Sequence, residues 1–178
     1  QDFTGPAYEA EPAPLDLPHD EVATFSSLFS PPSYSSAVLP LRTFYTSAKR
    51  LGIVNLIPEK DGIHRRYPLV SELDGEIVPS LAYAVVRNVL EKENLETNVL
   101  SRLSNTAIFD REAKLYLNWY GNGGTGRNGD DEDAVFNYYS YAGVIASFFQ
   151  ERNGEQPLID TEAFRDKIVI IGSNAPGL

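Results

Sequence analysis

Residues 53–70 read IVNLIPEKDGIHRRYPLV, a stretch in which two candidate strands flank a turn. The run 53–57 is apolar and rich in β-branched residues, which favour extended structure. Residues 58–62 begin with proline and end in Asp61-Gly62, a pair that supplies the positive φ of a tight hairpin turn. A second strand is expected over residues 63–70. The stretch therefore predicts an antiparallel hairpin.

Helices are predicted on both sides of this hairpin. Pro40 suits the first position of a helix, and apolar residues then recur at helical spacing until Gly52, a natural C-cap. Ser80 caps a helix that runs to about Glu93, and Ser140 caps another with the clearest apolar stripe in the chain. The stripe residues predicted to lie in the core are Val144, Ile145, Phe148 and Phe149.

Further strands complete the predicted fold. Residues 167–172 read KIVIIG, and a continuous apolar run between a charge and a glycine is typical of a central strand covered on both faces. Asp74-Gly75 indicates another turn, and residues 108–110 and 114–119 are expected to form a second antiparallel pair. We therefore predict an α/β fold, with a mixed β-sheet, antiparallel hairpins and packed helices.

The N-terminal region has a different composition. The first 40 residues hold seven of the 12 prolines and no Lys or Arg. Closely spaced prolines oppose both helices and central strands, so an extended arm is expected. We divide the chain into a Pro-rich acidic arm or linker over residues 1–38 and a globular domain over residues 39–178.

The overall charge and the cysteine count exclude several classes of function. Fifteen Lys and Arg against 25 Asp and Glu give the 178 residues a net charge of −10, and such a surface repels nucleic acid. The absence of Cys excludes disulfides and thiolate chemistry, and two His are too few for a His-rich metal site. No cofactor or metal is expected. Because the chain starts at Gln1 and contains no Met, we expect it to be a piece of a longer protein.

No sequence motif identifies an active site. Residues 124–129 read GTGRNG, as in a dinucleotide-binding loop, but the acidic residues 130–133 that follow would repel a phosphate. Those acids also lack the spacing of an EF-hand loop, so a solvated surface loop is favoured. No nucleophile elbow occurs. A carboxylate pair for hydrolysis remains open because such a pair is defined in space rather than in sequence.

Two adjacent arginines stand out on the second predicted strand. Strand alternation places Arg65 on the apolar face, where its guanidinium needs a carboxylate or several carbonyls. Asp61 and Asn55 are the nearest candidate partners. Arg65 is therefore either a structural clamp for the hairpin, the alternative we favour, or a group that binds an anion or ligand.

The candidate ligand-binding residues form one small polar group. The hairpin would bring four of them together, and the fifth is an asparagine at the end of a Tyr-flanked strand, whose amide can both donate and accept. They are Asn55, Asp61, Arg65, Arg66 and Asn118. We expect Arg65 to be structural and Arg66 to be the better ligand contact.

Several motifs resemble a single family. Residues 52–55 (GIVN) and 61–69 (DGIHRRYPL) resemble the "G-x-V-N … D-G-x-x-R-R-x-P-L" signature of the CHASE-type extracellular sensory domains, second class. Residues 117–121 (LNWYG) and 139–145 (YSYAGVI) are similar to a later strand and helix start of that family. Residues 164–178 (FRDKIVIIGSNAPGL) resemble its "F-x-D-K-I-V-L-I-G-x-x-A-x-G-L" end.

The resemblance covers residues 39–178 and implies a sensory function. It implies a periplasmic or extracellular, non-catalytic input domain of a bacterial inner-membrane receptor, with a cytoplasmic adenylate or guanylate cyclase or a kinase as output. The Asp-rich block and "W-P-W-P-R"-like stretch with which family members open are not found, so the chain matches the C-terminal portion of the family's extent.

Expected partners are an unidentified small-molecule or environmental ligand and a second copy of the chain, but no nucleic acid. Two alternatives remain open at this point: a secreted hydrolase with an unrecognised carboxylate pair, and a protein-interaction or oligomerisation module.

Overall fold

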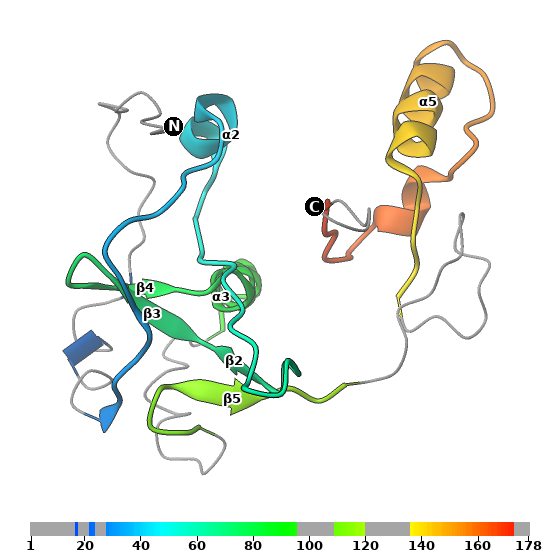
Figure 1. Cartoon of the computed structure of the whole chain (residues 1–178). Coiled ribbons are helices and arrows are strands. Elements are labelled where there is room, and N and C mark those ends of the chain that lie inside the picture. Colours follow the sequence, from blue (N-terminus) through cyan, green and yellow to red (C-terminus); the bar gives the residue numbers. More distant parts are fainter. Residues whose placement is uncertain (1–16, 18–21, 24–27, 96–108, 120–135, 173–178) are drawn as a thin grey trace, which may run out of the picture. The chain divides into compact units, whose positions relative to one another are not determined.

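The computed structural model describes residues 17, 22–23, 28–95, 109–119 and 136–172 (Figure 1). The chain divides into two compact units, 1–118 and 119–178, each of which is considered by itself. The described elements of the first unit are β1 (Ser33–Tyr34), α2 (Arg42–Ser47), β2 (Arg66–Pro68), β3 (Val70–Leu73), β4 (Glu76–Pro79), α3 (Leu81–Lys92) and β5 (Lys114–Tyr116). Those of the second unit are α5 (Tyr141–Arg152) and the 3-10 helix η1 (Thr161–Phe164).

The strands of the first unit form two small sheets. In one, β3 and β4 are an antiparallel hairpin, while β1 pairs in parallel with β3 on the other side. Asp74 and Gly75 both have positive φ, as the predicted turn requires. In the other sheet, β2 and β5 are antiparallel, with Arg66 opposite Tyr116. The predicted α/β class, with a mixed sheet and antiparallel strands, is confirmed.

The hydrophobic core of the first unit lies where these elements meet. Leu69, between β2 and β3, is buried together with Val70, Tyr83 of α3 and Ala113 before β5. Helix α3 begins as predicted, since the Ser80 hydroxyl accepts a hydrogen bond from the Tyr83 N–H at 3.3 Å. The core therefore ties the start of α3 to both sheets.

The predicted hairpin between residues 53–57 and 63–70 is wrong. In the run 53–57, Ile53 alone makes a bridge, parallel to Ser80, while β2 pairs with β5. Gly52 explains this arrangement, because its missing side chain lets the backbone approach the start of α3. A Cβ atom built on Gly52 would lie 2.5 Å from the Cα of Leu81.

The N-terminal region is not a detached extended arm where the structure describes it. Leu17 belongs to the buried core cluster, and Val22 and Phe29 pack against that cluster. Strand β1 joins β3, with the Glu72 N–H donating to the Pro32 carbonyl at 2.8 Å. Prolines are compatible with this placement because β1 is an edge strand. The division of the chain at residue 38 remains a prediction.

In the second unit, α5 starts at the predicted cap, with the Ser140 hydroxyl accepting from the Gly143 N–H at 3.4 Å. The prediction that its apolar stripe is buried is wrong. Val144 is half-buried, and three stripe residues are exposed: Ile145, Phe148 and Phe149. The helix packs instead through Gly143 and Ser147 against the buried Ile159.

The predicted central strand over residues 167–172 is also wrong. Residues 168–172 have no strand partner among the described residues, and the apolar residues 168–171 are all more than half exposed. The apolar composition favours extended structure, but a strand also needs a neighbour to satisfy its backbone groups. The predicted acidic loop over residues 121–133 lies outside the described residues.

Replacing Gly52 by Ala should destabilise the first unit by about 1–3 kcal/mol, because the added Cβ would collide with the Leu81 backbone. Chemical denaturation followed by circular dichroism measures this loss. Gly172→Ala is the matched control, since a Cβ there meets nothing within 4 Å. Equal stability of Gly52→Ala and the wild type would contradict the close contact.

Replacing Ser147 by Ala should destabilise the second unit by about 1–3 kcal/mol, because it leaves a buried N–H without an acceptor. The Ser147 hydroxyl accepts from the Ile159 N–H and donates to the Gly143 carbonyl, each at 2.8 Å. Thr46→Ala removes a similar but exposed hydroxyl bond within α2 and serves as control. A denaturation midpoint that moves no more than in this control would refute the role of the bond.

Candidate functional site

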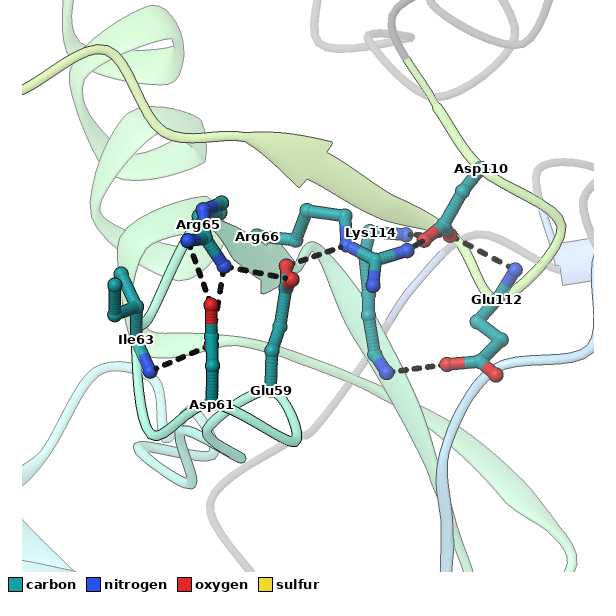
Figure 2. Close-up of polar contacts among 8 residues, drawn as sticks. All are labelled: Glu59, Asp61, Ile63, Arg65, Arg66, Asp110, Glu112 and Lys114. Atoms are coloured by element: carbon teal, nitrogen blue, oxygen red, sulfur yellow. Dashed lines mark hydrogen bonds and ion pairs between the residues drawn. The ribbon is translucent and has the colours of Figure 1, made fainter.

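A tight loop before β2 positions two carboxylates beside the adjacent arginines. The Gly62 N–H donates to the Glu59 carbonyl at 2.8 Å, and Gly62 has a positive φ that its lack of a side chain permits. The Ile63 N–H donates to Asp61 Oδ1 at 3.1 Å, which fixes that carboxylate. The loop therefore presents Glu59 and Asp61 to Arg65, just before β2, and to Arg66, the first residue of β2 (Figure 2).

Arg65 forms a bidentate ion pair with Asp61. Its Nη2 lies 2.7 Å from Asp61 Oδ2 and its Nη1 lies 3.1 Å from Asp61 Oδ1, while Nη1 is also 3.1 Å from Glu59 Oε2 (Figure 2). Asp61 is thus the partner expected from the sequence. The expected burial of Arg65 is wrong, because 43% of its side chain is exposed. Strand β2 starts only at Arg66, so alternation does not extend back to Arg65.

Arg66 connects the loop to a distant turn. Its Nε lies 3.0 Å from Glu59 Oε1, and its Nη1 lies 2.7 Å from Asp110 Oδ2 (Figure 2). The other oxygen of Asp110 accepts from the N–H groups of Glu112 at 2.9 Å and Lys114 at 3.0 Å. Arg66 therefore fixes the turn that leads into β5.

We call Glu59, Asp61, Arg65, Arg66 and Asp110 the arginine network. Its two ends differ in exposure, which is highest for the Asp61 side chain at 51% and lowest for that of Asp110 at 19%. Three carboxylates face two guanidinium groups, so the network carries one excess negative charge. Each carboxylate bonds a guanidinium, an arrangement that can hold separate segments together.

The ion pairs shift the pKa values of the network. The hydrogen bond from Arg66 lowers the pKa of Glu59, with a further contribution from Arg65. The hydrogen bond from Arg65 lowers the pKa of Asp61, helped by the Ile63 N–H. Asp61 in turn raises the pKa of Arg65, and Glu59 with Asp110 raises that of Arg66. Both carboxylates are therefore ionised at neutral pH.

The other predicted site residues lie apart from these ion pairs. Asn118 is exposed and follows Leu117, whose N–H donates to the Arg65 carbonyl at 2.8 Å. Asn55 is exposed, and no hydrogen bond among the described residues joins it to either arginine. Glu59, which lies in the predicted turn, was not predicted as a site residue. Asp110 was not predicted either, because the only sequence feature that marks it is its position at the start of a turn.

Comparison with known proteins gives the class of this domain. The model of the CHASE2 domain family matches residues 11–178, and the chain belongs to this family of extracellular sensory domains. The match begins at residue 11, within the segment 1–38 that we predicted to be an arm or linker. No curated protein and no solved structure matches the chain.

Two further findings concern only the described part of the chain. It contains no group of three or more His, Asp or Glu side chains arranged to hold a metal ion. None of its helices combines the length and the apolar character that crossing a bilayer requires.

The network should make folding stability depend on acid pH. The pKa values of Glu59 and Asp61 are lower in the folded state than in the unfolded state. The two carboxylates therefore stabilise the fold at pH values above their unfolded-state pKa values, which are about 4. This stabilisation is lost as the pH falls through their folded-state pKa values. A double variant, Arg65→Gln with Arg66→Gln, should lose stability less steeply than the wild type between about pH 5 and pH 2.

Denaturation midpoints measured across this pH range test the effect. Arg165→Gln is the control, because Arg165 forms an exposed ion pair with Glu162 outside the network. It should keep the acid dependence of the wild type. Parallel pH profiles for the wild type and the double variant would show that the network does not control acid stability.

Proposed function

We propose that the chain is the ligand-binding sensory domain of a bacterial inner-membrane receptor, located in the periplasm or outside the cell. It passes a conformational signal to a cytoplasmic cyclase or kinase, and it has no catalytic activity of its own. The family match supports the sensory role. The ligand-binding part rests on the arginine network, which faces solvent at one end and holds separate segments at the other.

The exposed pair Arg65–Asp61 supports a particular kind of ligand. Solvent-exposed ion pairs contribute little stability, so a ligand can separate this one at low cost. A simple anion that binds Arg65 would leave Asp61 unpaired beside the excess negative charge. A ligand with both an anionic and a cationic group would satisfy both side chains, with its anion bidentate on the guanidinium.

The remaining predicted residues keep a place in this proposal. The exposed amide of Asn118 lies one residue beyond the backbone bond between Leu117 and Arg65, where it can add donor and acceptor contacts to a ligand. Asn55 stays a predicted ligand contact. The sequence suggested the opposite division, with Arg65 structural and Arg66 in contact with the ligand. Because Arg66 is less exposed than Arg65 and bonds two separate segments, we instead assign the holding role to Arg66 and direct ligand contact to Arg65.

The arrangement does not favour a hydrolase. A carboxyl group that acts as general acid needs a raised pKa, whereas the pKa values of Glu59 and Asp61 are lowered.

A second copy of the chain remains a proposed partner. Exposed apolar side chains on α5, including those of Tyr141, Phe148 and Phe149, support such a contact, and the molecular mass by light scattering tests it.

A thermal-shift screen of the chain against pools of metabolites tests ligand binding. A ligand at 100 times its Kd should stabilise the domain by about 2.7 kcal/mol. We expect amino acids and other zwitterions to give the shift and Arg65→Gln to abolish it, while Arg165→Gln keeps it. In the full receptor, Arg65→Gln should lose the output response, whereas Arg165→Gln should keep it.

Two results would count against the proposal. If Arg65→Gln folds and still shows the full ligand shift, the network is not the binding site. If no pool stabilises the wild type and Arg65→Gln leaves the response of the receptor unchanged, the ligand-binding role fails.

A further inference from the structure

One residue lies between the turn that Asp110 caps and the start of α3. The N–H of Leu69 donates to the carbonyl of Ala113 at 3.2 Å, and the carbonyl of Leu69 accepts from the N–H of Ser80 at 2.8 Å. The Leu69 side chain is buried against Tyr83 and Ala113. A single residue therefore connects this turn to the helix cap by hydrogen bonds.

The turn itself depends on the arginine network. Ala113 is fully buried and has φ +60°, a left-handed conformation that is unfavourable for a residue with a Cβ atom. Its N–H donates to the Asp110 carbonyl at 3.1 Å, and the Asp110 carboxylate accepts from the N–H groups of Glu112 and Lys114. Arg66 holds that carboxylate in place.

A second connection runs from β2 to the same helix end. The Tyr67 hydroxyl donates to the carbonyl of Ile53 at 3.4 Å, and that carbonyl also accepts from the Leu81 N–H at 2.9 Å. The Ile53 N–H donates to the Pro79 carbonyl at 2.9 Å. Tyr67, the residue after Arg66, is thus linked through Ile53 to the backbone groups that begin α3.

We propose that the first turn of α3 is the element that responds to the arginine network, with Asp110 as the positioning residue between them. Separation of Arg66 from Asp110 releases the left-handed turn at Ala113, which loosens the bonds of Leu69 and the Ser80 cap. The inference deepens the proposed function and rests on it for its role in signalling. The coupling itself is a property of the folded chain and is measured without ligand.

Amide hydrogen exchange on the chain tests the coupling. Asp110→Asn removes the charge that holds Arg66 but keeps a side-chain oxygen for the turn N–H groups. The amides of Leu69, Ser80 and Tyr83 should exchange at least about tenfold faster than in the wild type, as expected for local opening. The reference amides are those of Glu72 and Asp74, which donate to the carbonyls of Pro32 and Tyr34 and should keep their wild-type rates.

Two further variants complete the design. A lysine at position 66 cannot bond both Glu59 and Asp110 as the guanidinium does. Arg66→Lys should therefore also accelerate hydrogen exchange at the same three amides. It takes the place of Asp110→Asn if that variant does not fold. Glu162→Gln breaks an exposed ion pair in the second unit and should leave all five amides unchanged.

The outcomes separate this inference from the proposed function. Unchanged exchange at Ser80 and Tyr83 in a folded network variant would overturn the coupling. Equal acceleration at Glu72 and Asp74 would also overturn it, because that pattern reports global unfolding. Either result leaves ligand binding at Arg65 to be decided by the thermal-shift screen.

Discussion

The first unit depends on a change of chain direction at Leu69. Strand β2 ends at Pro68 and β3 begins at Val70, yet the two strands belong to different sheets. Pro68 has no N–H to donate, and both backbone groups of Leu69 bond outside either ladder. Because Leu69 is buried, these bonds must be kept in the folded state. The relative placement of the two sheets and α3 follows from them.

The position of the arginines at the edge of this core follows from the cost of burying charge. A guanidinium needs partners for its N–H groups wherever water is excluded, and every carboxylate added for that purpose must be desolvated too. Arg65 and Arg66 avoid most of this cost because both remain partly exposed. The more enclosed end of the network is the one where Asp110 also bonds backbone N–H groups.

Local features of the fold could be predicted from the sequence, whereas pairings between distant segments could not. Ser80, Ser140 and Asp74-Gly75 act within a few residues, and each has its expected role. Alternation in a strand identifies its faces but not its neighbour. The apolar run 53–57 therefore suggested a hairpin, although β2 pairs with β5. The same limit applies to residues 167–172, where composition favours a strand but no described segment pairs with it.

The candidate site repeats this distinction, and with a functional consequence. Asp61 lies four residues from Arg65 and was predictable, whereas Asp110 lies 44 residues from Arg66 and was not. The local pair, Arg65–Asp61, is the more exposed one. The long-range pair, Arg66–Asp110, is bonded to the turn that contains the buried Ala113. A sensory domain needs a contact that a ligand can change easily beside one that is coupled to the fold. In the proposed mechanism, the adjacent arginines provide both, Arg65 through its exposed pair with Asp61 and Arg66 through its bond to Asp110.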